Sequence, residues 1–341
     1  MNIKVMLVAG SMAVAAAIGP VPGYPQSGPT GSEPVAGAVK EQAYPYRPVR
    51  IIAPNPPGGG FDFVARVCAQ KLTEQLGQQV VVENRTGAGT LVGTEVAAKS
   101  TADGYTLLVG SLSNLAANPG LYKKLPYDPL ADFVPVGMIV AYSYALVARK
   151  DLPAQSLREI VEFARGNPGK LTYASAGVGT GQHVAAAVLA QLAGVQMLHV
   201  PYRGAQAAHL DLQSGRVDLF FDNAVTAKPY VDEGRIKAYA VSSAQRFAGL
   251  PTVPTVKETG VAKMEMDAWF GMFARSGTPA AVLRRLGAEM EKMIQAPDVV
   301  ARFEKGGGRM LRMSPAEGNA FVKAEIRKWS TLIRQAGITA E

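Results

Sequence analysis

The sequence predicts an α/β fold with two lobes, and three observations support this prediction. The chain has 341 residues, of which 48% are hydrophobic, and this is enough for two globular domains that each bury a core. From Val49 onward, short β-branched runs alternate with helical patterns, which predicts right-handed crossovers and a mainly parallel sheet. The alternation restarts after Asp151, and a helical tail follows it. We therefore expect a second α/β unit inserted into the first.

The first 43 residues have the composition of an export signal and a loose leader. Lys4 precedes the uncharged apolar run Val5–Ile18, which is shorter than the roughly 20 residues that a membrane-spanning helix needs. Residues 19–43 are rich in proline, glycine, serine and alanine. A secretory signal peptide has this pattern, so we expect an exported, periplasmic protein. The cleavage site stays open, and an uncleaved anchor helix is the alternative.

The predicted elements of the first unit alternate between strands and helices. They are strands Val49–Ala53, Val80–Glu83 and Thr106–Val109 and helices Phe61–Leu76 and Thr90–Lys99. Cys68, the single cysteine, lies on the apolar face of its helix, so it is expected in the core and no disulfide can form within the chain. The uncharged run Phe133–Ala148 contains Pro135 and Gly137, and we expect two buried strands there rather than a membrane span.

The second unit begins with a capping box, Ser156–Glu159, which opens a helix. Its further elements are strands Leu171–Ala174, Met197–Val200, Val217–Phe221 and Ile236–Val241, with helices between them. The strand Asp267–Ala274 and a helical tail follow, and the tail has too little sheet to fold alone. We therefore assign residues 44–149 and 268–341 to the first lobe and residues 150–267 to the second. Two chain crossings between them form a hinge, and a cleft between two lobes is a common ligand site.

The charge pattern and the motif content exclude several classes of function. The formal net charge is +8, but the basic residues are scattered, whereas a nucleic-acid-binding protein gathers them into a stripe. We interpret the charge as a weak preference for anions. The three histidines lack metal-ligand spacing, and neither the phosphate-loop motif nor the serine nucleophile motif occurs. We expect no metal, no cofactor, no catalytic residue and no enzymatic activity.

Two glycine-rich loops follow strands in corresponding places of the two units. They are Ala53–Asp62 and Ala174–His183, and each leads into a helix. Glycines let main-chain N–H groups point into a concavity, and the helix start adds about half a positive charge. The two loops therefore predict a site, one loop from each lobe, that holds an anion without lysine or arginine. Turn formation alone is the alternative explanation of each loop.

Several side chains near these junctions have two interpretations each. Asp62 either contacts ligand or pairs with Arg66 four residues later, and His183 either contacts ligand or caps its helix. Asp222 and Asn223 end a strand, where ligand contact and helix capping both fit. Each remaining candidate either binds ligand or has a structural role. Phe61 forms a pocket wall or part of the core, Tyr202 and Trp269 line an aromatic pocket or lie in the core, and Arg203 binds a carboxylate or is simply exposed.

The segment Gly87–Gly93 has the pattern G-x-G-x-x-x-G between a strand and a helix, which invites a dinucleotide-binding interpretation. That fingerprint requires an acidic residue closing the next strand, but the next strand ends Leu108-Val109-Gly110. A nucleotide-dependent α/β enzyme therefore remains only as an alternative function.

These segments together resemble the Bug family, the extracytoplasmic solute receptors of tripartite tricarboxylate transporters. The matching segments are Val49–Pro54, Pro57–Asp62, Glu83–Gly89, Ala102–Leu107, Leu171–Thr180, His199–Gly204, Phe221–Asn223 and Val253–Gly260. The resemblance covers nearly the whole mature chain. It implies a periplasmic-binding-protein fold, similar to type II, that closes on a small carboxylate held by the backbone and short side chains of facing loops.

Carried over by position, the resemblance implies ligand contacts from both lobes. In the first lobe these are Pro57, Gly58, Gly59, Phe61, Asp62, Ser111, Ser113 and Asn114. In the second lobe they are Ala176, Gly177, Gly179, Thr180, His183, Tyr202, Arg203, Asp222 and Asn223. One departure matters, because Asn114-Leu115 stands where the family commonly has Thr-His. The identity of the ligand therefore cannot be taken from relatives.

The function expected from the sequence is capture of a small organic mono- or dicarboxylate by a monomeric receptor. The closed receptor would then be presented to the permease subunits of a tripartite tricarboxylate transporter. A sensor that docks on a membrane kinase is the alternative partner relationship, and the sequence does not separate the two.

Overall fold

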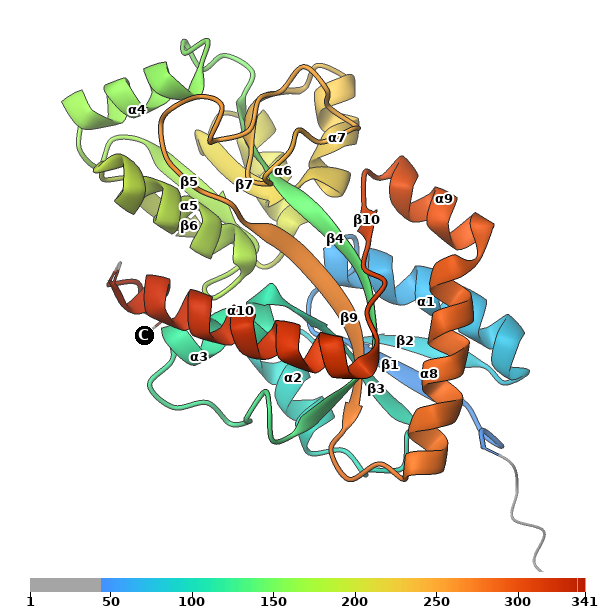
Figure 1. The fold of residues 1–341 in the computed structure, drawn as a ribbon. Coiled ribbons are helices and arrows are strands. Elements are labelled where there is room, and N and C mark those ends of the chain that lie inside the picture. Colours follow the sequence, from blue (N-terminus) through green and yellow to red (C-terminus); the bar gives the residue numbers. More distant parts are fainter. Residues whose placement is uncertain (1–43, 336, 341) are drawn as a thin grey trace, which may run out of the picture. The chain divides into compact units, whose positions relative to one another are not determined.

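The computed structural model describes residues 44–335 and 337–340, which belong to one compact unit, Gln42–Glu341. The predicted signal peptide and leader lie outside the described residues. Within these limits the strands form one sheet in the order β2-β1-β3-β9-β4-β7-β5-β6, and β10 and β8 both pair with β4. Figure 1 shows helices packed around the two ends of this sheet.

The first lobe is built around parallel strands. Its N-terminal elements are β1 (Val49–Ala53), α1 (Gly60–Leu76), β2 (Val80–Asn84), α2 (Leu91–Ala98), β3 (Thr106–Ser111), the π-helix η1 (Leu112–Ala117) and α3 (Asn118–Leu121). Strand β1 lies between β2 and β3 and pairs in parallel with both. The apolar face of α1 is buried, and Cys68 is fully buried in this core, as predicted. Burial raises the pKa of the Cys68 thiol to about 12, so the thiol stays protonated.

Strand β4 (Phe133–Arg149) corrects the prediction of two strands in this run. It is one continuous strand that pairs antiparallel with β9 (Asp267–Arg275) over its first part and with β7 and β8 over its second part. The register shifts between Pro135 and Gly137 and again between Met138 and Val140. These irregularities absorb the proline and the glycine without ending the strand.

The second lobe has the same alternation of strands and helices. Its elements are α4 (Leu157–Gly166), β5 (Thr172–Ser175), α5 (Gly181–Ala193), β6 (Leu198–Pro201), α6 (Ala205–Gln213), β7 (Leu219–Asn223), α7 (Ala224–Asp232) and β8 (Ile236–Val241). Strand β5 pairs in parallel with β6 and β7. Pairing is therefore parallel inside each lobe, while β4 and β9 run antiparallel to their neighbours. The sheet is mixed rather than mainly parallel.

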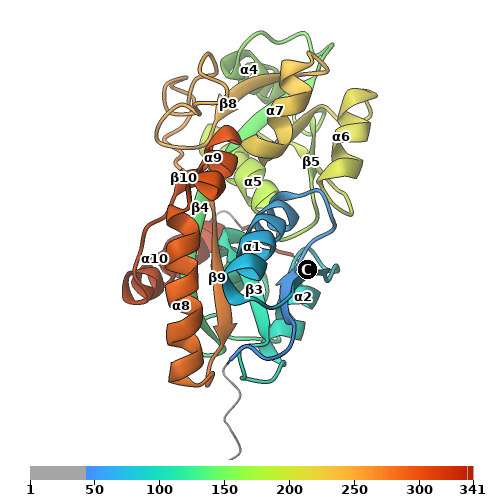
Figure 2. The same cartoon turned by 90° about the vertical axis from the view of Figure 1, so that its right-hand side faces the viewer.

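The C-terminal tail packs on the first lobe. It consists of α8 (Ala280–Gln295), α9 (Pro297–Lys305), β10 (Arg309–Met310) and α10 (Pro315–Gln335). Figure 2 shows α8 beside α1, and the two helices are in contact. Trp269 on β9 points toward α10, where its indole N–H donates to Glu325 at 2.9 Å, and it is 1% exposed. Trp269 therefore belongs to the core.

The two lobes meet at the point where the chain crosses between the two parts of the sheet. The Tyr144 N–H donates to Ser242 Oγ at 3.0 Å, and that hydroxyl donates to the Met266 carbonyl at 2.5 Å. The Ser243 N–H donates to Ser143 Oγ at 3.1 Å. These bonds tie the crossing of β4 at 143–144 to the returning segment at 266–267, so the two crossings form one hinge. The assignment of residues 44–149 and 268–341 to one lobe and of 150–267 to the other stays a prediction.

None of the helices in the described part of the chain is both long enough and apolar enough to cross a membrane.

Candidate functional site

A small cavity lies between the lobes beside the hinge. Its volume is about 10 Å³, which is room for about one water molecule. The residues that line it are Asn55, Pro56, Gly59, Gly60, Phe61, Ser113, Tyr144, Ala176, Gln182, Ala205, Asn223 and Phe270. This lining contains no lysine, arginine or carboxylate, so any anion held here must be held by neutral donors.

The start of helix α1 presents free main-chain donors to this cavity. The N-cap residue is Gly59, which has no side chain to cap the helix. Among the described residues no acceptor is recorded for the N–H groups of Gly60 and Phe61, the first two residues of α1. Unsatisfied N–H groups at a helix start attract anions, because they carry the positive end of the helix dipole. This is the arrangement predicted for the first glycine loop.

Asp62 bonds to the first glycine loop and does not line the cavity. Its carboxylate accepts the Gly58 N–H at 3.0 Å and forms an ion pair with Arg66 at 2.9 Å. Burial alone would raise the pKa of Asp62, but bonds from Arg66, Gly58 and Asn84 hold that pKa below its ordinary value. Asp62 therefore stays ionised and fixes the turn at Gly58, and neither Asp62 nor Pro57 lines the cavity.

Asn223 faces the same cavity from the second lobe. It ends strand β7 and is 5% exposed, and its Oδ1 has no hydrogen-bond partner among the described residues. Its Nδ2 lies 2.8 Å from where a Cβ would stand on Gly60. The unpartnered Oδ1 is an acceptor and suits a donor group, whereas Nδ2 is the atom of this side chain that can donate to an anion beside the free N–H groups of α1.

The second glycine loop differs from the first, because the N–H groups of its three glycines are already bonded within the protein. The Gly177 N–H donates to Ser175 Oγ at 3.2 Å, and the Gly179 N–H donates to His183 Nδ1 at 3.4 Å. The Gly181 N–H crosses the cleft to Ser113 Oγ at 2.8 Å. The Thr180 side chain caps helix α5. The two loops face a shared crevice, and among the described residues no acceptor is found for the N–H of Gln182, the second residue of α5, which lines the cavity.

The loop after β3 turns two of its predicted contact residues inward. Ser111 and Asn114 form a capping box at the start of η1, in which Asn114 Oδ1 accepts the Ser111 N–H at 2.8 Å. Asn114 is fully buried, and its Nδ2 donates to Thr94 at 3.1 Å. Of the predicted residues in this loop, only Ser113 lines the cavity.

His183 belongs to a stack of rings beneath the second glycine loop. Its imidazole lies 4.1 Å from that of His199, and His199 stacks on Tyr173 at 4.9 Å. Burial lowers the pKa of His183 to about 4. Burial, together with the neighbouring His183, lowers the pKa of His199 to about 3. Both rings are therefore neutral near pH 7, and the neutral His183 Nδ1 can accept the Gly179 N–H.

Asp222 holds a buried polar network directly behind the cavity. Its carboxylate accepts from His209 Nε2 at 2.8 Å, from Gln182 Nε2 at 3.3 Å and from the Thr226 hydroxyl. Asp222 is fully buried. Its bonds position Gln182, which lines the cavity, so Asp222 acts on the site through Gln182 and does not line the cavity itself.

Replacing Asp222 with asparagine is expected to lower the free energy of unfolding by about 1–3 kcal/mol, because one partner of a buried bond is left unsatisfied. Urea denaturation of wild type and D222N measures the difference. Unchanged stability together with weakened ligand binding would instead identify Asp222 as a direct ligand contact.

Tyr202 and Arg203 lie outside the cavity. The Tyr202 hydroxyl donates to Asp211 at 3.0 Å, and burial together with this carboxylate raises the pKa of Tyr202 to about 12. Arg203 is exposed, and no ion pair or hydrogen bond of its guanidinium is recorded within the described residues. The structure does not bring either side chain to the cavity.

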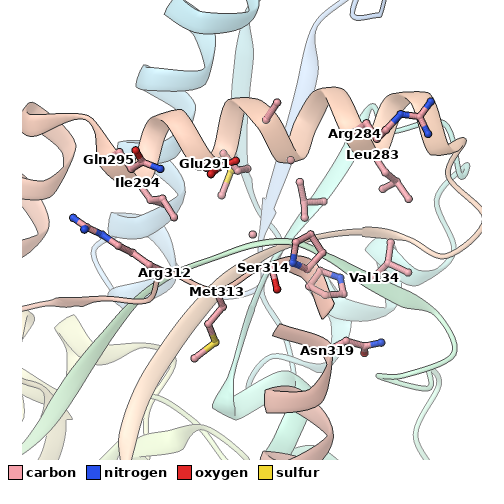
Figure 3. A pocket seen from close by; sticks show the side chains of 17 residues that line it. Val134, Leu283, Arg284, Glu291, Ile294, Gln295, Arg312, Met313, Ser314 and Asn319 are labelled. Carbon is pink, nitrogen blue, oxygen red and sulfur yellow. The ribbon is translucent and has the colours of Figure 1, made fainter. Parts of the chain in front are cut away.

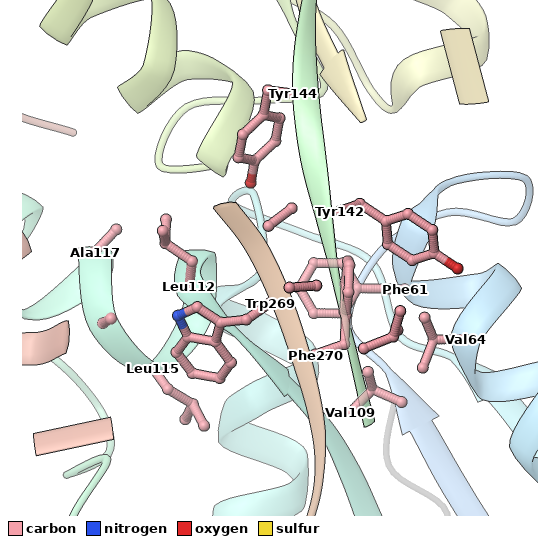
Figure 4. Close-up of a cluster of buried hydrophobic side chains, with 14 of the residues drawn as sticks. Phe61, Val64, Val109, Leu112, Leu115, Ala117, Tyr142, Tyr144, Trp269 and Phe270 are labelled. Carbon is pink, nitrogen blue, oxygen red and sulfur yellow. The ribbon is translucent and has the colours of Figure 1, made fainter. Parts of the chain in front are cut away.

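The predicted ligand contacts omit seven residues that line the cavity, namely Asn55, Pro56, Gly60, Tyr144, Gln182, Ala205 and Phe270. Figure 4 shows Tyr144 projecting from β4 toward the first lobe, with Phe61 and Phe270 close together below it. The rings of Phe61 and Phe270 meet edge to face at 5.3 Å. One signal was present for Tyr144, since Ser143-Tyr144 is a polar interruption of the otherwise apolar run Phe133–Ala148.

A larger groove lies elsewhere on the first lobe. It has a volume of about 870 Å³ and runs between α8 and the segment that leads into α10 (Figure 3). Apolar side chains such as Leu283, Ile294 and Met313 line it, with Arg284 and Arg312 on its margins. No residue predicted to bind ligand lines this groove. The described residues also contain no cluster of histidine, cysteine and carboxylate side chains that could hold a metal ion.

Two α/β lobes joined by crossing strands, with a polar cavity at the hinge, are the architecture of periplasmic solute-binding proteins, and this chain resembles the solved structure of the periplasmic binding protein BugD (TM-score 0.83, 34% identity, 87% of this chain and 99% of that chain). Two further solved structures that it resembles are ligand complexes. One is an adipate complex of Rpa4515 from R. palustris (TM-score 0.83, 32% identity, 87% of this chain and 99% of that chain). Another is MatC from Rhodopseudomonas palustris with bound malate (TM-score 0.82, 32% identity, 85% of this chain and 100% of that chain).

The chain belongs to the TctC family, described as "Tripartite tricarboxylate transporter family receptor", whose model matches residues 64–338. Among characterised sequences, BugT of Bordetella pertussis is 34% identical over 304 residues, which cover 89% of this chain and 93% of BugT. The resemblance to the Bug family and the two-lobed fold predicted from the sequence are thus confirmed.

Proposed function

We propose that this receptor captures a small organic mono- or dicarboxylate between its lobes and that the carboxylate binds at the start of helix α1. The observation that carries the proposal is the pair of free N–H groups, Gly60 and Phe61, beside the Asn223 Nδ2 donor, which lies 2.8 Å from where a Cβ on Gly60 would stand. All three residues line the inter-lobe cavity. Two main-chain donors, the helix dipole and an amide suit a carboxylate oxygen, and they need no cationic side chain.

Closure of the lobes supplies the selectivity. When the lobes shut, the donors of α1 lose contact with bulk water, and a donor left without an acceptor there costs about 1–3 kcal/mol. A solute whose head group does not match is therefore bound about ten- to a hundredfold more weakly. Phe61 and Phe270 supply apolar contact for the carbon chain next to the polar end.

Binding requires the lobes to separate first. The cavity in the closed arrangement holds about 10 Å³, far less than a four- to six-carbon dicarboxylate occupies. The hinge at 143–144 and 266–267 is the place where the lobes can turn, because within residues 44–335 the chain passes between the two parts of the sheet at these crossings. Ligand then replaces direct contacts between the lobes, such as the bond from Gly181 to Ser113.

Membership of the TctC family supports a proposal about the transport partners and the cellular location of this receptor. We propose that the closed, loaded receptor is presented in the periplasm to the permease subunits of a tripartite tricarboxylate transporter, with no bond made or broken in the ligand. Malate and adipate, the ligands of the two structural relatives, bracket the size of solute expected here.

A thermal-shift screen with malate, adipate, succinate and benzoate tests this proposal. A ligand at a thousandfold its dissociation constant is expected to stabilise the folded chain by about 4 kcal/mol. The methyl esters of the same acids serve as controls, because they lack the charge that the start of α1 attracts. A screen in which esters and acids stabilise equally, or in which no acid stabilises, contradicts the proposal.

A further inference from the structure

The glycine motif 87–93 lies at the boundary between the lobes, and its three glycines have different surroundings. A Cβ on Gly87 would lie 2.6 Å from the Val92 side chain, and a Cβ on Gly93 would lie 2.5 Å from the Arg85 carbonyl oxygen. Both contacts stay within the first lobe and shape the turn into α2. Gly89 instead faces the second lobe, where its Cβ would lie 2.2 Å from the Val178 carbonyl oxygen.

We infer that Gly89 is a positioning residue for ligand capture, because it lets the loop 87–89 of the first lobe close onto the backbone of the loop 177–179 of the second. The inference rests on the proposed function and gives the motif a role that requires no nucleotide. The second lobe shows the same close approach, because a Cβ on Gly177 would lie 3.4 Å from the Gly89 Cα. Backbone therefore packs against backbone where the lobes meet.

Any side chain at position 89 obstructs this closure. The atom that it would meet belongs to the main chain of Val178, so no rotamer change can move the obstacle aside. The second loop is also held in place from within, because the Thr180 hydroxyl donates to the Gly177 carbonyl at 2.7 Å and the Gly179 N–H is bonded to His183. The lobes must therefore stay apart when Gly89 carries a Cβ, and the bond between Gly181 and Ser113 on the same loop is lost with them.

The test compares Gly89→Ala with Gly77→Ala. Both glycines have left-handed backbone conformations, with φ of +69° and +65°, but a Cβ on Gly77 would meet nothing within 4 Å. The two variants therefore share the backbone strain of an alanine at positive φ, and only one obstructs the lobes. Isothermal titration with the best-binding acid among malate, adipate, succinate and benzoate is expected to show binding weakened about tenfold or more by G89A and little changed by G77A.

A second measurement needs no ligand. The Gly181 N–H is bonded across the cleft to Ser113, so its hydrogen exchange reports closure of the ligand-free chain. We expect this amide to exchange about tenfold faster in G89A than in wild type or G77A. Adding Val178→Ala to G89A should restore neither binding nor protection, since the obstacle is a carbonyl group.

The outcomes separate this inference from the proposed function. If none of the four acids binds wild type, the proposed function fails, while the exchange comparison still tests the role of Gly89. If G89A and G77A show the same exchange at Gly181, or if Val178→Ala rescues G89A, the inference is overturned even where a carboxylate binds.

Discussion

Replacing Gly60 with valine is expected to weaken carboxylate binding at least about a hundredfold while leaving the fold intact. A Cβ on Gly60 would lie 2.8 Å from Asn223 Nδ2 and 3.0 Å from the Phe270 ring. Valine adds three carbon atoms to a cavity of about 10 Å³, and it covers the N–H groups that we assign to the carboxylate. A hundredfold loss corresponds to about 2.7 kcal/mol of binding free energy. Isothermal titration with the acids used in the thermal-shift screen measures it.

Gly166→Val is the matched control for this change. Gly166 ends helix α4, and a Cβ there would meet nothing within 4 Å. Both variants place a β-branched residue at a helix terminus, so their effect on helix stability is comparable. Equal affinity of G60V and wild type would remove the start of α1 from the binding site. Equal loss of binding in both variants would show that the effect of valine at position 60 is not local.

Much of the fold follows from local patterns in the sequence. The strand Val49–Ala53 has the predicted bounds, and the first helix ends at the predicted Leu76 but begins one residue earlier than predicted, at Gly60. Apolar periodicity and a glycine stop signal decide these positions. The continuous strand β4 could not be predicted in this way. Pro135 and Gly137 are local strand breakers, and only antiparallel pairing with β9, more than a hundred residues away in sequence, carries the strand past them.

The candidate site was less predictable than the fold, since the direction of a side chain depends on distant partners. The two glycine loops at strand-to-helix junctions both contribute residues to the cavity, and their role in ligand binding stays a prediction. However, the sequence pattern does not show that Asn114 turns inward to cap η1, or that the Gly181 N–H is taken by Ser113, 68 residues away. Tyr144 and Phe270 reach the cavity from the two crossing strands, so their role appears only when the hinge is assembled.

Stability is expected to fall as the pH falls from about 6.5 toward 4, because the folded chain keeps His183 neutral. Its pKa is lowered from 6.5 to about 4 by burial, so the unfolded chain binds a proton in this window and the folded chain does not. The contribution of His183 is fully present above its unfolded pKa and is lost as the pH approaches the folded pKa. His183 accounts for about 2 kcal/mol of the loss between pH 7 and pH 5, and His199, whose pKa is lowered to about 3, adds to it in the same window; urea denaturation at the two pH values measures the sum.

The variant His183→Gln tests whether the buried His183 ring causes this loss of stability at lower pH. The variant removes the titrating ring from the stack with His199, so the dependence of its stability on pH between 7 and 5 should be smaller than that of wild type. Carboxylates with lowered pKa, such as Asp62 and Glu317, lose their contribution only below their unfolded values near 4, so they do not produce the effect in this window. A protonated His183 can no longer accept the Gly179 N–H, but the folded chain protonates this ring only as the pH approaches 4, so carboxylate affinity should stay unchanged between pH 7 and pH 5 and decline only near pH 4. If wild type and H183Q lose stability equally between pH 7 and pH 5, the buried histidine is not the cause.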